Sequence, residues 1–304
     1  MSARTNRMLA FAALFAVLPG CVVNGSGVSK TEGRPISDFD GIKSTAMVDV
    51  EIRQSARVDG IDLTCDDNLL DIIETKVKDG QLVVGLPVGV NALSHTPCKL
   101  VTGNTQLYDV VSTGSGDITL NGPAWSLEHV RSTGSGDVKV TLRGEFEGQT
   151  GEDLVDDTDE SGGLTEAPEE EGSLTEGQED SEAFVLEALP AAVRMDIETT
   201  GSGDVRIDGL DLDKVFLTTT GSGDVSLEGD ANKLDAKSTG SGDVRTKALH
   251  VHRVDVLTTG SGDMTAWADK SATAKSTGSG DITIYGNPDS RSRNSTGSGD
   301  IRFR

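Results

Sequence analysis

The sequence is poor in the large side chains that fill an ordinary globular core. Only 4% of its 304 residues are aromatic, with 2 Trp, 2 Tyr and 7 Phe, whereas 37 are Gly. Aromatic residues normally supply much of the buried area of a compact domain. The chain must therefore bury its apolar surface through a repetitive arrangement of smaller side chains.

Signatures of metal and nucleic-acid binding are also scarce. The chain has 3 Cys without Cys-x-x-Cys spacing and 4 His, of which His250 and His252 share one expected strand. This composition argues against a transition-metal site. The net charge is −23, and so acidic a chain repels nucleic acid and anionic lipid headgroups. We therefore expect neither as a ligand, and no organic cofactor is indicated.

Only one long hydrophobic run occurs, and it is N-terminal. Arg4 and Arg7 give the chain a basic start. Residues 8–18, which follow, carry no charge, but this run is shorter than the roughly 20 residues that a helix needs to span a bilayer. Leu-Pro-Gly-Cys at 18–21 follows and resembles a bacterial lipobox. We predict a lipoprotein signal peptide over 1–20, lipidation of Cys21 and a flexible tether over 21–37. An ordinary secretory signal with an unmodified Cys21 is the alternative.

Two further cysteines, Cys65 and Cys98, are a candidate disulfide. Export into an oxidising compartment favours pairing, provided that the two Cα atoms come close enough. A pair of buried thiols is the alternative. The sequence leaves both open.

The negative charge is concentrated in one segment. Between Glu145 and Glu187 the chain has 17 Asp and Glu and no Lys or Arg, which leaves about −6 of the net charge of −23 for the rest. Carboxylates mixed with Gly, Ser, Thr and Pro, and with few apolar residues, are typical of a solvated, disordered segment. We predict a disordered acidic insert over 145–190, and a low-affinity cation sink or interaction tail is the alternative.

A five-residue motif recurs through most of the chain. Thr-Gly-Ser-Gly-Asp occurs 8 times at spacings of 18 to 20 residues, apart from one spacing of 67 that contains the acidic insert. Such a period is the signature of a repeat architecture. The aspartates that end the motif are Asp117, Asp137, Asp204, Asp224, Asp243, Asp263, Asp281 and Asp300.

Apolar residues alternate with polar ones on both sides of the motif. Ile118 and Leu120 follow one copy, for example, and Val110 precedes it. Period-2 alternation indicates strands with one buried face, which short repeats can cover only by stacking in parallel. We predict an all-β parallel β-helix of 18–20-residue coils. An inward Ser or Thr two residues before the first Gly is expected to hydrogen-bond along the axis, and the Gly positions to allow a positive φ or close backbone approach.

The N-terminal third reads as a cap on this β-helix. Ser-Thr-Ala-Met-Val-Asp-Val at 44–50 is an eroded copy of the motif in which the glycines are replaced. Residues 42–54, 58–65 and 72–86 alternate like longer strands, and Lys-Asp-Gly-Gln at 78–81 fits a hairpin turn. Because terminal repeats are usually atypical, we predict an N-terminal β cap.

Several segments resemble a known family. They are Phe-Asp-Gly-Ile at 39–42, Val-Asp-Val-Glu-Ile at 48–52, Asp-Asn-Leu-Leu at 67–70, Gly-Gln-Leu-Val-Val at 80–84 and the serial motif itself. Together they resemble the putative auto-transporter adhesin, head GIN domain family, over 38–304 apart from the insert. The resemblance implies a right-handed β-helix on envelope proteins, often lipoproteins, of Gram-negative bacteria. It supplies no catalytic residues.

The motif aspartates are the candidate site. Carboxylates stacked at about 4.8 Å would repel each neighbour by roughly 1 kcal/mol in water, so the fold must offset this repulsion or bind cations. A Ca²⁺ ladder is one hypothesis, since Ca²⁺ takes carboxylate oxygens. The favoured hypothesis is structural: each Asp accepts hydrogen bonds from Ser hydroxyls and backbone N–H groups at the corner. Calcium-binding β-rolls have a much shorter repeat.

These observations predict a lipid-anchored, non-catalytic, adhesin-like module that binds a surface glycan or protein. Val22, rather than the Asp of retained inner-membrane lipoproteins, follows Cys21 and favours the outer membrane. A structural or regulatory envelope protein that binds a protein partner through the cap is the alternative. A polysaccharide-active β-helix enzyme is disfavoured, because every repeat presents the same Asp without a distinct acid–base cluster.

Overall fold

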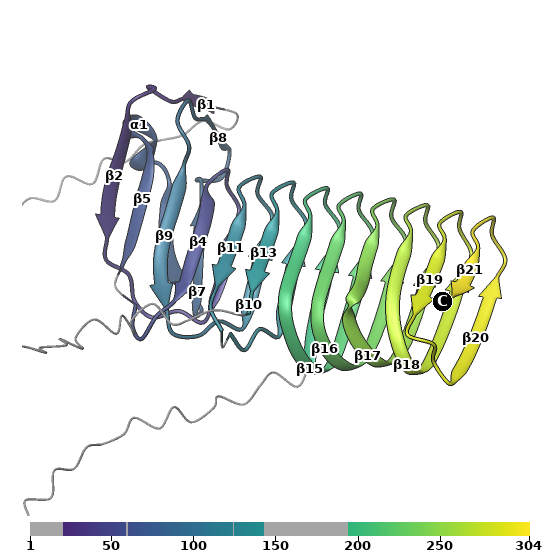
Figure 1. Cartoon of the computed structure of the whole chain (residues 1–304). Coiled ribbons are helices and arrows are strands. Elements are labelled where there is room, and N and C mark those ends of the chain that lie inside the picture. Colours follow the sequence, from purple (N-terminus) through teal and green to yellow (C-terminus); the bar gives the residue numbers. More distant parts are fainter. Residues whose placement is uncertain (1–20, 59, 124, 143–193) are drawn as a thin grey trace, which may run out of the picture.

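The protein is an all-β molecule in which strands of successive repeats lie side by side (Figure 1). The structure, a computed structural model, describes residues 21–58, 60–123, 125–142 and 194–304. The predicted signal peptide and acidic insert lie outside these residues. No helix in the described part of the chain is long and apolar enough to cross a membrane.

The N-terminal third contains nine strands and one short helix. They are β1 Cys21–Asn24, β2 Ser29–Arg34, β3 Gly41–Ser44, β4 Asp49–Gln54, β5 Ile61–Asp66, α1 Asp67–Leu70, β6 Glu74–Lys78, β7 Gln81–Gly85, β8 Val90–Leu93 and β9 Lys99–Asn104. The repeats supply β10 Asp109–Ser112, β11 Ile118–Asn121, β12 His129–Ser132, β13 Val138–Thr141, β14 Arg194–Thr199, β15 Val205–Thr219, β16 Val225–Ser238, β17 Val244–Thr258, β18 Met264–Ser276, β19 Ile282–Tyr285, β20 Ser290–Ser295 and β21 Ile301–Phe303.

Strands before and after each motif form two parallel rows, which we call the repeat stack. Before the motif, Ser112 of β10 is in register with Ser132 of β12; after it, Ile118 of β11 is in register with Val138 of β13. The same pairing continues to β20 and β21. The motif itself is the corner that joins the two rows, so each motif residue lies next to its equivalent in the neighbouring repeat.

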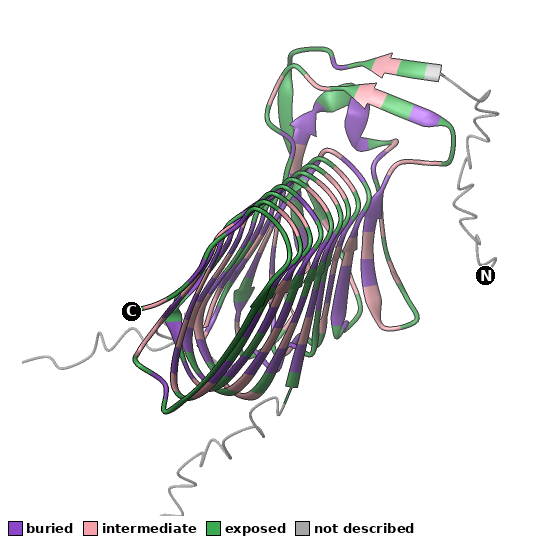
Figure 2. Ribbon diagram, turned by 90° about the vertical axis from the view of Figure 1, so that its right-hand side faces the viewer, coloured by how far each residue is buried: buried purple, intermediate pink, exposed green. Residues whose placement is uncertain are grey.

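The inside of the stack is apolar. Buried residues alternate with exposed ones along the strands, as Figure 2 shows, and Val110, Ile118, Leu120 and Leu227 have no exposed surface. This is the alternation that the sequence predicts for strands with one buried face.

The inward hydroxyl column differs from the prediction. The hydroxyls of Ser44, Ser112, Ser132, Thr199, Thr219, Ser238 and Thr258 are buried and have no hydrogen-bond partner among the described residues. The Oγ of Ser276 donates to the carbonyl of Gly280, which is within its own repeat rather than along the axis. The axial hydrogen bonding expected for this column is therefore wrong, because repeats in register keep successive hydroxyls a full strand spacing of about 4.8 Å apart.

The motif requires glycine because the backbones of neighbouring repeats approach each other closely at the corner. A Cβ at Gly134 or Gly136 would overlap the carbonyl oxygen of Gly114 or Gly116 in the preceding repeat. None of these four glycines has a positive φ, so space rather than backbone conformation excludes a side chain.

Residues 44–50 form the first repeat, as predicted. Ser44 is in register with Ser112 and Val50 with Ile118, and Asp49 accepts a hydrogen bond from the amide of Asp117. Ala46 and Val48 occupy the places of the two glycines. They are tolerated because no motif corner precedes this repeat.

At this end of the stack β7 and β9 continue the two rows in parallel, and antiparallel strands cover them. The predicted turn at 78–81 joins β6 and β7 with positive φ at Asp79 and Gly80, and β7 pairs with β3. On the other row, β9 pairs with β4, β5 with β9 and β2 with β5.

The flexible tether predicted over 21–37 is wrong for most of that segment. β1 pairs in parallel with β8, and β2 pairs with β5. Residues 21–24 are therefore in a paired strand, because the apolar start of this segment finds a partner strand about 70 residues later in the chain.

Candidate functional site

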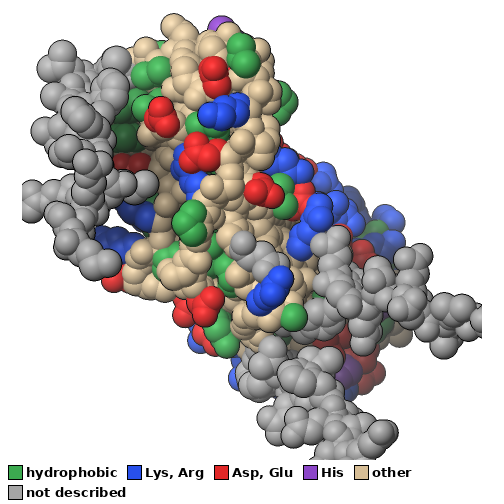
Figure 3. Space-filling view, turned by 90° about the vertical axis from the view of Figure 1, so that its left-hand side faces the viewer, with side chains coloured by type: hydrophobic (Ala, Val, Ile, Leu, Met, Phe, Trp, Pro, Cys, Tyr) green, Lys and Arg blue, Asp and Glu red, His purple; other side chains and the backbone are tan. Residues whose placement is uncertain are grey.

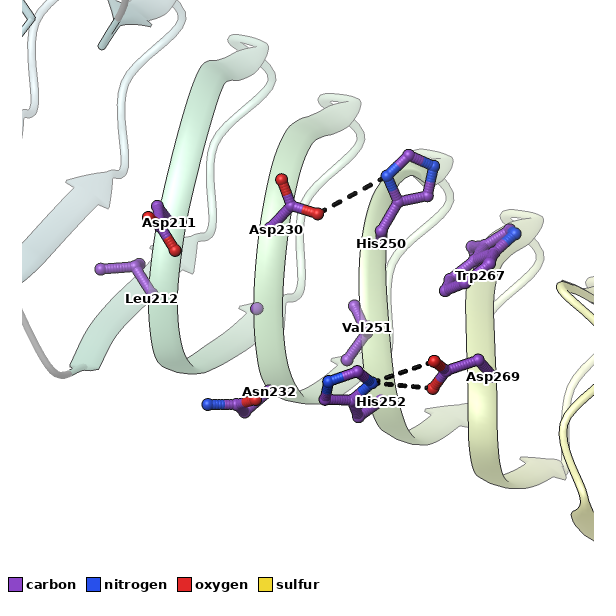
Figure 4. Close-up of a pocket in the computed structure, with 10 residues that line it drawn as sticks. Asp211, Leu212, Asp230, Asn232, His250, Val251, His252, Trp267 and Asp269 are labelled. Atoms are coloured by element: carbon purple, nitrogen blue, oxygen red, sulfur yellow. Dashed lines mark hydrogen bonds and ion pairs between the residues drawn. The ribbon is translucent and has the colours of Figure 1, made fainter.

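The outer surface of the repeat stack carries a groove of about 460 Å³ between β15 and β18. The side chains around it are shown in Figure 4. One outward row runs through Asp211, Asp230, His250 and Trp267, which are in register with one another. Asn232, His252 and Asp269 line the other side of the groove. Four consecutive repeats therefore contribute to a single site.

Polar contacts hold the imidazole rings of the groove. His252 Nδ1 lies 2.9 and 3.1 Å from the two carboxylate oxygens of Asp269, and His250 Nδ1 lies 3.7 Å from Asp230 Oδ1. The His250 and Trp267 rings meet edge to face at 4.9 Å. Trp267 is held on its other side by the backbone at Gly286, where a side chain would overlap the indole.

Irregular strand pairing creates the groove. The register between β17 and β18 shifts between Thr246 and His250 and again between Val251 and Arg253. Such bulges re-aim side chains and are common beside functional sites. The repeats differ in length by up to two residues, and the bulges accommodate this difference. Aligning the repeats on their motifs therefore does not place the groove residues at equivalent positions.

The groove suits recognition of a polar ligand. Its carboxylates accept hydrogen bonds, the Asn232 amide donates and accepts, and the indole N–H donates. Three carboxylates within one groove disfavour an anion. The sequence signal for this site was faint: two of the four histidines and one of the two tryptophans fall in consecutive repeats outside the motif.

The eight motif aspartates follow one another along the corner, and each contacts its neighbour. The backbone amide of Asp137 donates to Asp117 Oδ1 at 2.8 Å, and the pattern continues through the column to Asp300, whose amide donates to Asp281 Oδ1 at 2.8 Å. The donor is the next aspartate's own amide rather than a serine hydroxyl. We call this arrangement the Asp ladder.

Two arginines, which the motif alignment missed, offset charge in the Asp ladder. Arg245 lies 2.6 Å from Asp224 and 3.0 Å from Asp243, and Arg302 lies 2.8 Å from Asp281 and 2.6 Å from Asp300. Burial opposes ionisation of Asp224, but the amide of Asp243 and the guanidinium of Arg245 outweigh it and lower the pKa. The amide of Asp300 and then Arg302 lower the pKa of Asp281. Each arginine follows a motif Asp by two residues.

Candidate metal ligands do not converge. No group of three or more His, Cys, Asp or Glu that could hold a metal ion occurs within residues 21–58, 60–123, 125–142 and 194–304. The structure joins Cys65 to Cys98 in the cap, with Cα atoms 4.2 Å apart. This pair connects the end of β5 to the segment that leads into β9.

The fold and the surface groove together define an all-β repeat protein with a candidate binding surface. The chain belongs to the family described as "Putative auto-transporter adhesin, head GIN domain", whose model matches residues 38–147 and 178–288. This confirms the family that the sequence resemblance indicated. No match was found among curated proteins.

Solved structures of similar fold carry names that denote binding. A putative lipid binding protein from Parabacteroides distasonis has 19% identity and a TM-score of 0.68, over 93% of this chain and 100% of that one. Putative adhesins from Parabacteroides merdae and Bacteroides fragilis each have 20% identity, with TM-scores of 0.67 and 0.60, over 93% of this chain and 99% and 100% of theirs. At these identities the likeness shows a shared fold.

Proposed function

We propose that the protein is a non-catalytic, lipid-anchored binding module of the bacterial cell envelope. The observation that carries this proposal is the groove around His250 and Trp267, where four consecutive repeats bring carboxylate, imidazole, amide and indole groups together. We infer that the repeats form a right-handed parallel β-helix. Parallel pairing at a spacing of 18–20 residues and the strong preference of parallel crossovers for the right hand support this inference.

The envelope location rests on the N-terminal sequence. Leu-Pro-Gly-Cys at 18–21 ends a short apolar run, and Val22 follows the candidate lipidated Cys21. We assign the anchor to the outer membrane by resemblance to sorted lipoproteins. Membership in an adhesin-named family supports a surface or envelope role.

The groove favours an uncharged or cationic polyhydroxylated ligand, such as a surface glycan. Carboxylate, amide and indole groups provide the hydrogen bonds that sugar hydroxyls make, while the carboxylates repel acidic ligands. A non-catalytic role is supported by the Asp ladder, whose carboxylates accept hydrogen bonds from the backbone amides of the next repeat. The name of the family also denotes binding.

Binding of the mature protein to an array of neutral, amino and acidic glycans tests the proposal. Trp267→Ala is expected to weaken binding of a neutral or amino glycan by at least about tenfold, as loss of a central aromatic contact does. Phe216→Ala is the matched control, because Phe216 is a half-buried aromatic of the same stack, under Arg194 and outside the groove. Equal binding by both variants would remove the groove from the function, and cleavage of a bound glycan would make the protein an enzyme.

A further inference from the structure

Exposed apolar residues of the described chain gather at one end of the cap. Large hydrophobic side chains exposed to solvent are Val22, Val28, Val88, Leu93 and Tyr108. All but Tyr108 belong to β1, β8 or the turns next to them. Figure 3 shows hydrophobic side chains at several places on the upper part of the cap, with charged side chains between them. A cluster of this kind on an otherwise polar surface marks a contact site.

The pairing of β1 with β8 separates an inner face from an outer one. Val23 is in register with Ala92, and both pack against the core. Side chains alternate along a strand, so Val22 and Leu93 point the other way. Val22 is 50% exposed, Leu93 58%, and Val88, in the turn before β8, is fully exposed. We call Val22, Val88 and Leu93 the β1–β8 face.

The chain around the β1–β8 face lacks charge. Residues 21–29 and 85–98 contain no Lys, Arg, Asp or Glu, in a sequence in which 25% of residues are charged. Asp66, at the end of β5, and Asp67, at the start of α1, lie close to this segment and accept hydrogen bonds from it. Asp66 accepts from the amide of Gly27, and Asp67 from the hydroxyl of Ser26. Protein interfaces typically have a polar rim around an apolar centre, whereas the two segments that form this face carry no charge. An apolar face without charges is better suited to contact with lipid.

The face is fixed to the predicted anchor without slack. β1 begins at Cys21, and its pairing with β8 continues to the amide of Gly25, which donates to the carbonyl of Leu93. Asn68 donates to the carbonyl of Asn24. Adjacent Cα atoms are about 3.8 Å apart, so a lipid on Cys21 would place Val22 within one residue of the bilayer surface.

We propose that the β1–β8 face lies on the membrane when Cys21 carries its lipid. This rests on the lipid anchor of the proposed function and adds a second, apolar contact, which holds the cap against the bilayer instead of letting it swing on a tether. The lipid and the adjacent apolar face would together bury more apolar area at the membrane than the lipid alone, and membrane binding strengthens with buried apolar area. A protein partner on this face would have to compete with the membrane beside it.

Fluorescence quenching on vesicles tests the proposal. The full-length protein is expressed with its signal, purified with its lipid, and reconstituted into phosphatidylethanolamine–phosphatidylglycerol vesicles containing a nitroxide-labelled phospholipid. A fluorophore is attached through Val88→Cys, or through Asn294→Cys on the exposed strand β20 as the matched control. The Val88 side chain is fully exposed, so this substitution should not affect folding. We expect quenching of at least about twofold at position 88, since interfacial contacts reach the headgroup and acyl boundary, and none at 294.

The outcomes separate the anchor from the face. Protein that floats with the vesicles and carries the acyl mass, but is unquenched at 88, would retain the proposed anchor and overturn the docking. Protein without acyl mass that fails to float would overturn the anchor, and the docking with it. A label at 88 that is shielded without being quenched by the nitroxide lipid would assign the face to a second copy of the protein, and would also overturn membrane docking.

Discussion

At the scale of single residues, the corner of each repeat depends on the absence of side chains. Gly223 lies so close to Gly203 that a Cβ would overlap its carbonyl oxygen, and the same holds for each equivalent pair. The neighbouring atom is backbone, which cannot move aside without shifting a whole repeat. The glycines therefore set the distance between repeats.

The substitution Gly223→Ala should lower the free energy of unfolding by about 1–3 kcal/mol, the usual cost of overpacking. Gly33→Ala is the control, because a Cβ there would meet its nearest atom, Asp62 Oδ1, at an ordinary 3.6 Å. Urea unfolding of the two variants and the parent measures the difference. Equal stability of Gly223→Ala and Gly33→Ala would show that the corners can separate at little cost.

Asp66 is a second critical residue, because it ties the β1–β8 region to the cap. Its carboxylate accepts hydrogen bonds from the Ser94 hydroxyl and from the amides of His95, Thr96 and Gly27, which together lower its pKa from 3.8 to about 2. The folded state thus favours the ionised form. Its contribution to stability is complete above pH 3.8 and is lost as the pH falls through about 2.

Asp66→Asn should therefore lower stability at neutral pH and flatten the dependence of stability on pH between about 4 and 2. Urea unfolding across that range gives the slope for the variant and the parent. Asp67→Asn, which removes an adjacent exposed carboxylate, controls for loss of charge alone. If Asp66→Asn kept the slope of the parent, another carboxylate would have to be responsible for the acid sensitivity.

At the scale of elements, the Asp ladder connects one repeat to the next through side chains as well as strands. Asp263 accepts from the amide of Asp281 and donates its own amide to Asp243. Asp263→Asn keeps an acceptor oxygen and should change the free energy of unfolding by less than about 0.5 kcal/mol, whereas Asp263→Ala should cost about 1 kcal/mol through the unpaired amide. Thermal melting with calcium or a chelator completes the test. A calcium-dependent rise in the parent that Asp263→Ala abolishes would assign the ladder to cation binding instead.

The Cys65–Cys98 pair connects two elements of the cap, as the Asp ladder connects successive repeats. The two residues are 33 apart in sequence, so a bond between them restrains the unfolded chain between β5 and β9. Replacing both with Ala should lower the free energy of unfolding by about 2–4 kcal/mol. Thiol titration of the denatured, unreduced protein should find neither cysteine free. Two titratable thiols would leave them as buried cysteines without a bond.

Sequence reasoning predicts elements well where they repeat. The strands on either side of the motif, the first repeat at 44–50 and the turn at 78–81 follow from local pattern alone. It failed for residues 21–37, because the partner of β1 is β8, far along the chain. It also could not assemble the groove, since Asp230, His250 and Trp267 meet only after bulges change the register of each repeat.

At the scale of the whole molecule, the two ends of the repeat stack are unlike. The first repeat, β3 and β4, is covered by β7 and β9 of the cap. Among the described strands the last repeat pairs on one side only, β20 with β18 and β21 with β19, and every residue of β20 is exposed. Stability in a stack of this kind is close to a sum of nearest-neighbour contacts. A terminal repeat with one neighbour should therefore open before the rest.

Hydrogen exchange measures this asymmetry directly. Amides of Ser290–Ser295 are expected to exchange at least about a hundredfold faster than those of Val225–Ser238 in the middle of the stack, because fraying of the end needs only local opening. The first repeat is the internal control, since β3 and β4 are equally terminal in the repeat order but covered by the cap. Their amides should be protected nearly as well as the middle. Uniform exchange from one end to the other would mean that the stack opens as a single cooperative unit, and that the cap stabilises every repeat equally.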